Sequence, residues 1–123
     1  MYILDSAVII DILKSKERSE EVAKIVGEAR LGTTAFSIFE VYVGLTEKEK
    51  KTSDDFFNNL EVIEFSHAAS LESIEIEKEL TRSGKKINAI DVFIAGICAA
   101  NNCTLITSDK GFEKIRGLQK RII

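Results

Sequence analysis

The stretch INAIDVFIAGICAANNCTLITSD, residues 87–109, constrains this chain more than any other. From residue 89 to residue 100 every side chain is apolar or glycine except Asp91, and a helix that is apolar on all sides lies inside a domain. The segment is too short to cross a bilayer, which needs about 20 apolar residues. The Asn-Asn pair that follows ends the predicted helix, and CTLIT predicts a central strand. A carboxylate in this setting costs free energy unless a cation or hydrogen-bond donor meets it.

One explanation of Asp91 needs no function. Asn88 can serve as the N-cap of the helix, which puts Asp91 at the third helical position. There its carboxylate could accept the Asn88 backbone N–H in a capping box and lie favourably at the positive end of the helix dipole. The alternative is a site shared with acids from elsewhere in the chain.

Length and composition favour one soluble domain. The chain has 123 residues, 45% of them hydrophobic and 30% charged, which predicts a single domain over residues 1–123 with one core. The first residues enter an apolar strand without a basic leader, so we expect a cytoplasmic protein with no membrane span. The net charge of -3 argues against bulk electrostatic binding of nucleic acid, but not against a local basic rim around an acidic centre.

Histidine and cysteine chemistry contribute little here. His67 is the only histidine, which nearly excludes a histidine-based metal site or a Ser-His catalytic pair. Cys98 and Cys103 follow neither a C-x-x-C nor a zinc spacing, and we expect both to be reduced core thiols.

Strand and helix patterns alternate along the whole chain. Apolar or alternating runs predict strands at 2–4, 31–34, 61–65, 103–107 and 119–123. Helical spacing predicts helices at 6–13, 19–29, 35–50, 54–59, 66–82 and 88–100, with a helical turn at 110–115. This alternation predicts an α/β fold with a mostly parallel central sheet and helices on both of its faces. Ligands of such sheets bind beyond the carboxyl ends of the strands.

Three acids are predicted at that edge of the sheet. Asp5 ends the first strand, Asp109 ends the strand at 103–107, and Asp91 begins the helix that leads into that strand. Each has an ordinary explanation, because Asp5 and Asp109 could cap the elements that follow them. Their combination at one edge is more informative than any one of them.

A fourth acid, Glu40, lies near the middle of the helix predicted from residue 35. Its neighbours at helical spacing include Ser37 and the small Gly44, so a solvated glutamate is the default interpretation. Apolar residues of the same helix are expected on its core side, namely Phe36, Phe39 and Val43.

Several carboxylates in one place repel one another unless a cation is present. Oxygen ligands without histidine or cysteine suit Mg²⁺ or Mn²⁺. An ion held in this way can present a bound water as nucleophile and neutralise charge on a phosphodiester. The pattern therefore predicts hydrolytic cleavage of phosphodiester bonds.

Four segments together resemble the motifs of PIN-domain nucleases. They are YILDSAVI around Asp5, TTAFSIFEVYVGL around Glu40, INAIDVFIAGICAANN around Asp91 and LITSDKGF around Asp109. They occur in order at suitable spacings over essentially the whole chain, and the match is best with the small VapC-like toxins of toxin–antitoxin pairs. Ser stands at position 6 where Thr is commoner, and the segment before Asp91 lacks the proline or extra acid often found there.

The resemblance implies a PIN-like three-layer sandwich and a Mg²⁺- or Mn²⁺-dependent endoribonuclease that acts as a toxin. Carried over position by position, the catalytic and metal-binding acids are Asp5, Glu40, Asp91 and Asp109, with Ser6 and Thr107 in support. It further implies a homodimer and a cognate antitoxin that occupies the groove beside the site.

Two surface features accompany this interpretation. Lysines near elements that approach the site are expected to hold RNA phosphates, and these are Lys14, Lys16, Lys85, Lys86 and Lys110. The helix from residue 35 carries more apolar side chains than one face can bury, which also predicts a homodimer.

Other functions match the sequence less well. A phospho-receiver domain needs an adjacent acid pair after the first strand, where this chain has Asp5-Ser6, and a D-x-D phosphatase needs an acid at position 7, which is Ala. Structure-specific DNA nucleases usually carry helical insertions for which 123 residues leave no room. A PIN nuclease that is not a toxin and a PIN scaffold that only binds RNA stay open as alternatives.

Overall fold

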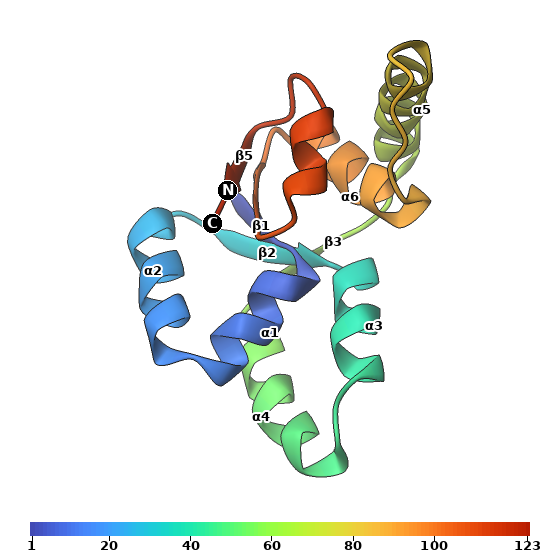
Figure 1. Ribbon diagram of the computed structural model, residues 1–123. Helices are drawn as coiled ribbons and strands as arrows, with labels where there is room; N and C mark the ends of the chain where they lie inside the picture. The colour runs from blue at the N-terminus through green and yellow to red at the C-terminus, as the bar shows by residue number, and fades with distance from the viewer.

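A five-stranded, fully parallel sheet forms the centre of the protein in the computed structural model, which describes all 123 residues (Figure 1). Its strands are β1 (Tyr2–Leu4), β2 (Leu31–Thr34), β3 (Glu61–Ile63), β4 (Thr104–Thr107) and β5 (Lys120–Ile122), in the order β3-β2-β1-β4-β5. The chain builds outward from β1 on one side and then returns to its other side. The point where strand order reverses therefore lies between β1 and β4, where α/β sheets bind ligands.

Six α-helices and one 3-10 helix surround the sheet. They are α1 (Ser6–Lys14), α2 (Lys16–Val26), α3 (Ala35–Val43), α4 (Glu47–Phe57), α5 (His67–Arg82), α6 (Ala89–Ala100) and η1 (Lys110–Lys114). None of these helices has the length and apolar character needed to span a membrane.

The central strands alternate their side chains between two cores. Ile3 pairs with Leu105 and lies in the core under α5 and α6, whereas Leu4 pairs with Ile106 and lies in the core under α1 to α4. All four side chains are fully buried. Helices thus cover both faces of the sheet, as Figure 1 shows, and the α/β class predicted from the sequence is confirmed.

Three predicted helices had wrong boundaries, because capping side chains begin helices elsewhere. The helix expected at 35–50 ends at Val43. Thr46 is the N-cap of α4 in a capping box: its side chain accepts the Glu49 N–H, and the Glu49 side chain accepts the Thr46 N–H. The short helix expected at 54–59 is the end of α4. The helix expected at 19–29 begins at Lys16 because the Ser15 side chain accepts the Arg18 N–H.

The face assigned to α3 was also partly wrong. Phe39 and Val43 were expected in the core, but they are 66% and 71% exposed. The buried face of α3 instead carries Ser37 and Val41, four residues apart. Because α3 is apolar around most of its circumference, periodicity alone could not identify the side that packs against the sheet.

A close approach of α5 and α6 fixes the helix that carries Asp91. A Cβ atom on Gly96 would lie 1.9 Å from Ser73 Oγ and 2.6 Å from the Ala69 carbonyl oxygen. The Ser73 hydroxyl donates to the Ala69 and Val92 carbonyls, at 2.8 and 3.4 Å, and so links the two helices. Only glycine fits at position 96.

We expect Gly96→Ala to lower the free energy of unfolding by about 1–3 kcal/mol, because its methyl group would overpack against the backbone of α5. Gly44→Ala is the matched control, since a Cβ there meets only the Val41 carbonyl oxygen at 3.7 Å. Urea unfolding of both variants measures the difference. A Gly96→Ala protein as stable as Gly44→Ala would contradict the close approach.

Candidate active site

Asp5 lies at the carboxyl end of β1 and begins α1. Its Oδ1 accepts the Ser6 backbone N–H at 2.9 Å, and its Oδ2 accepts the Thr107 hydroxyl at 2.8 Å. Asp5 is 5% exposed, and this burial raises its pKa, with a smaller contribution from the charge of Asp109, against the lowering effect of its two hydrogen bonds. The capping role is therefore real, and the second bond ties Asp5 to β4.

Thr107 connects the two strand-end aspartates. Its hydroxyl donates to Asp5 and accepts the Asp109 backbone N–H at 3.0 Å. The exposed Asp109 side chain accepts the Gly111 N–H at 2.7 Å and so caps η1. Ser6 contributes its backbone N–H to the same group.

Asp91 does not make the capping-box bond that the ordinary explanation requires. Asn88 is the N-cap and its Oδ1 accepts the Ile90 N–H at 2.8 Å, but the Asp91 carboxylate has no hydrogen-bond partner. Partial burial raises the Asp91 pKa to about 6, with further contributions from the charges of Asp5, Asp109 and Glu40. The capping box at Asp91 was therefore a wrong explanation.

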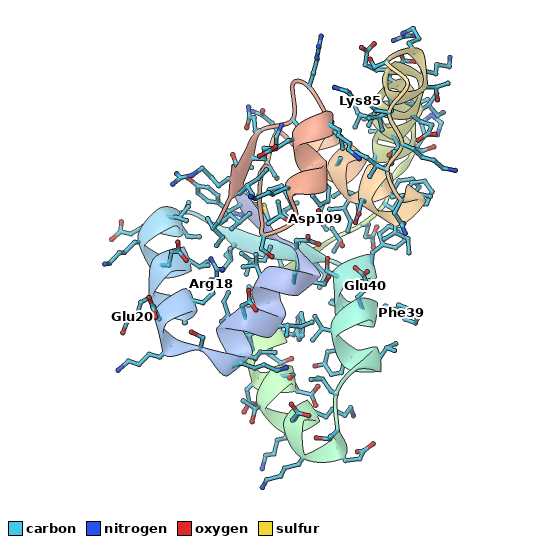
Figure 2. All side chains as sticks on the ribbon, viewed as in Figure 1. Arg18, Glu20, Phe39, Glu40, Lys85 and Asp109 are labelled. Atoms are coloured by element: carbon cyan, nitrogen blue, oxygen red, sulfur yellow. The ribbon has the colours of Figure 1, made fainter.

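Glu40 lies on the exposed side of α3, within electrostatic reach of Asp91. Figure 2 shows Glu40 on α3 and Asp109 before η1 at the centre of the same face of the molecule. Ser37, expected beside Glu40 on a solvated stripe, is fully buried and accepts from Thr34, which caps α3. The other three predicted acids thus lie within electrostatic reach of Asp91.

No basic side chain compensates this acidic group. All five ion pairs of the protein involve other acids. No three Asp, Glu, His or Cys side chains are arranged closely enough to hold a metal ion in this conformation. One oxygen of Asp5 and one of Asp109 accept the backbone N–H groups that they cap. Each carboxylate oxygen has two lone pairs, so these bonds leave acceptor capacity. In donor chemistry the group fits Mg²⁺ or Mn²⁺, which take oxygen ligands.

The predicted lysines are spread over three places. Lys110 directly follows Asp109, and Lys85 and Lys86 lie exposed in the segment before α6. Lys14 lies at the other end of α1 from Asp5, beside Glu49 of α4, and a helix of this length spans about 13 Å. Lys16 follows at the start of α2, where it pairs with Glu20. Their contact with RNA stays a prediction.

The structure adds two features to this site that the sequence did not reveal. The buried Thr33 hydroxyl donates to the Leu4 carbonyl at 2.9 Å and ties β2 to β1 next to Asp5. Phe36 and Phe93 contact each other, with ring centroids 5.8 Å apart, and join the helices that carry Glu40 and Asp91. The Thr33-Thr34 pair at a strand end was a usable signal for the first, whereas nothing in the sequence indicated the second.

We expect Asp91→Asn to stabilise the metal-free protein by about 1 kcal/mol above pH 6, a value reduced for solvent screening of a partly buried group. The folded protein raises the Asp91 pKa from 3.8 to about 6, so the ionised form opposes folding. This penalty is complete above pH 6 and disappears as the pH falls toward 3.8.

Thermal unfolding in EDTA at pH 7.5 and pH 4 measures this effect. Asp55→Asn on α4, an exposed position, is the control and should show no such pH-dependent gain. An Asp91→Asn protein less stable than wild type at pH 7.5 would restore the capping explanation.

Comparison with known proteins places this chain in a family. The PIN domain model matches residues 2–118. The chain is 32% identical over 99 residues to ribonuclease VapC2 of Rickettsia felis, covering 73% of this chain and 74% of the relative. It is 22% identical over 124 residues to the tRNA(fMet)-specific endonuclease VapC of Shigella flexneri, covering 96% and 94%.

Solved structures agree on the fold. The VapBC2 structure from Rickettsia felis, bound to a DNA fragment from their promoter, superposes with a TM-score of 0.86 at 24% identity over 99% of this chain and 98% of that chain. VapBC-1 from Haemophilus influenzae superposes with a TM-score of 0.83 at 23% identity over 98% and 96%. With its matching family model and its VapC relatives, this chain belongs to the PIN domain family.

Proposed function

We propose that this protein is a Mg²⁺- or Mn²⁺-dependent endoribonuclease and the toxin of a toxin–antitoxin pair. The observation that carries the proposal is Asp91, a partly buried carboxylate with no hydrogen bond and no cation, surrounded by three further acids. A fold tolerates such crowding where function requires it. The ribonuclease and endonuclease names of its VapC relatives support the reaction class.

In this proposal the ion is held by Asp5, Glu40, Asp91 and Asp109. When bound, it supplies a water of lowered pKa and a positive charge for the phosphodiester. The Thr107 hydroxyl and the Ser6 N–H orient Asp5, so that its carboxylate keeps one position as the charge around it changes. Neutral pH lies above the Asp91 pKa of about 6, so the carboxylate is mostly ionised and can bind a cation.

The toxin role brings two partners. The VapBC-5 structure from Mycobacterium tuberculosis, which resembles this chain, is described as a member of the VapBC family of toxin–antitoxin systems, and a cognate antitoxin is therefore part of the proposal. A second copy of the chain is the other partner. Phe39 and Val43, four residues apart on α3, form an exposed apolar face that a homodimer would cover.

We expect single-stranded RNA to be cleaved in Mg²⁺ or Mn²⁺ and left intact in EDTA. Asp91→Asn should lower the cleavage rate by more than about 100-fold, because even outer-shell partners of a metal contribute about 10–100-fold. Added Mg²⁺ should also raise the melting temperature of wild type more than that of the variant.

Asp55→Asn serves as the control and should cleave like wild type. The readout is a time course on labelled RNA, with protein purified in parallel to exclude contaminating nuclease. Undiminished cleavage in EDTA, or a fully active Asp91→Asn protein, would refute the proposal.

We expect a dimer by sedimentation at micromolar concentration, and a monomer for Phe39→Glu, because a charge would be buried without a partner. Lys51→Glu, an exposed change on α4, is the control for added negative charge and should leave the dimer intact. A monomeric wild-type protein would exclude this role for the α3 face.

A further inference from the structure

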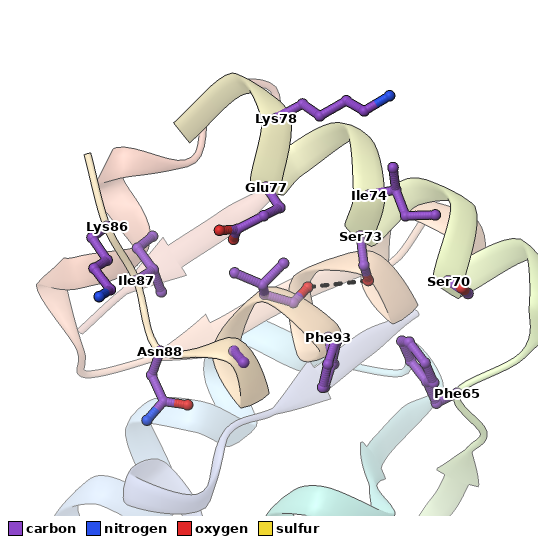
Figure 3. Close-up of a pocket in the computed structure, with 12 residues that line it drawn as sticks. Phe65, Ser70, Ser73, Ile74, Glu77, Lys78, Lys86, Ile87, Asn88 and Phe93 are labelled. Atoms are coloured by element: carbon purple, nitrogen blue, oxygen red, sulfur yellow. Dashed lines mark hydrogen bonds between the residues drawn. The ribbon is translucent and has the colours of Figure 1, made fainter. Parts of the chain in front are cut away.

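A hollow of about 1000 Å³ lies between α5 and the beginning of α6. Its apolar wall includes Phe65, Ile74 and Phe93, and its polar wall includes Glu77, Lys86 and Asn88. Figure 3 shows Glu77 and Ile74 on α5 on one side, with Lys86 and Asn88 at the entry to α6 on the other. Neither the sequence motifs nor the acidic group accounts for this hollow.

The hollow adjoins the acidic group through two helices. Asn88 in its wall is the N-cap of α6, and Asp91 lies in the first turn of the same helix. Phe93 contacts Phe36, which lies four residues before Glu40 on α3. The helices that carry Asp91 and Glu40 thus also contribute to this wall or contact it.

The aromatic wall is partly exposed to solvent at Phe65. Phe65 is 39% exposed and contacts Phe93, with ring centroids 4.9 Å apart, while Phe36 supports both rings from the side at 5.9 and 5.8 Å. Three mutually packed rings hold Phe65 in place without covering it. Rings fixed in this way are suited to stacking on a planar ligand.

The polar groups at the hollow have unused bonding capacity. Lys86 and Glu77 take part in no ion pair, and the Glu77 carboxylate accepts no hydrogen bond. Asn88 uses its Oδ1 to cap α6, which leaves its amide N–H groups free. The site thus combines a cation for a phosphate with a carboxylate acceptor for N–H donors of a base edge.

We propose that this hollow seats one base of the single-stranded RNA substrate, beside the phosphodiester that the acidic group cleaves. The base stacks on Phe65, its N–H groups face Glu77, and Lys86 contacts its phosphate. Unstacked bases on aromatic side chains are a general mode of single-strand recognition. The inference rests on the proposed ribonuclease function and adds a binding subsite to it.

RNA fits this hollow better than a second copy of the chain does. The exposed apolar pair Phe39 and Val43, proposed above as the homodimer face, is not part of its wall, whose own exposed apolar residues are Phe65 and Ile74. A purely apolar protein contact would also bury Lys86 and Glu77 without partners, which is costly. RNA instead gives each of them a complementary group.

Binding of a labelled single-stranded RNA that wild type cleaves tests the subsite, measured by fluorescence anisotropy in EDTA. Phe65→Leu keeps an apolar side chain but removes the ring, and we expect it to weaken binding about tenfold. Leu71→Ala is the control, because Leu71 is an exposed apolar residue of α5 outside the hollow, and it should bind like wild type.

Two further variants test the subsite independently, in case Phe65→Leu does not fold. Ile74→Glu adds a carboxylate to the hollow from an exposed position and should weaken binding at least as much. Lys86→Met should flatten the dependence of log affinity on log salt by about 0.7, the value for one phosphate contact on a single strand. Lys51→Met on α4 should leave the slope unchanged.

The outcomes separate this subsite from the proposed function. If wild type cleaves no RNA, the ribonuclease proposal itself fails. If wild type cleaves RNA while Phe65→Leu and Ile74→Glu bind it normally, the subsite is refuted. Intact RNA binding with a changed sedimentation coefficient would assign the hollow to a second copy, and intact RNA binding with loss of antitoxin binding would assign it to that protein.

Discussion

The candidate active site is organised around a carboxylate that the fold leaves without compensation. Asp91 begins the most apolar helix of the protein, accepts no hydrogen bond and faces the charges of three other acids. Such an arrangement opposes folding at neutral pH. It persists because α6 is held by packing elsewhere along its length, with six buried residues and a glycine contact to α5 that admits no side chain.

The parallel pairing of β1 with β4 organises the other acids. Tyr2 aligns with Thr104 and Leu4 with Ile106. Asp5, directly after β1, and Thr107, the last residue of β4, therefore lie at the same carboxyl edge of the sheet. The Thr107 hydroxyl then bridges Asp5 to the backbone of Asp109. The caps of α1 and η1 and the acidic group are thus made from the same side chains, and capping and a functional role do not exclude each other at these positions.

Much of this could be predicted from the sequence, because strand ends and helix starts are local features. The α/β class, the parallel sheet and the positions of Asp5 and Asp109 after strands follow from alternating patterns and the carboxyl-edge rule. The orientation of α3 could not be predicted, since Phe39 and Val43 are as apolar as the buried Val41. The hollow at Phe65 escaped prediction because residues far apart in sequence form it.

Carboxylate-detected NMR titration of Asp91, in the metal-free protein and with Mg²⁺ added, tests the central claim most directly. Partial burial, together with the crowding of acids, predicts an Asp91 pKa of about 6 without metal and a clear decrease when Mg²⁺ is present, because a bound cation favours the ionised form. An Asp91 pKa that stays near its ordinary value of 3.8 and does not respond to Mg²⁺ would contradict an uncompensated, cation-binding acidic centre.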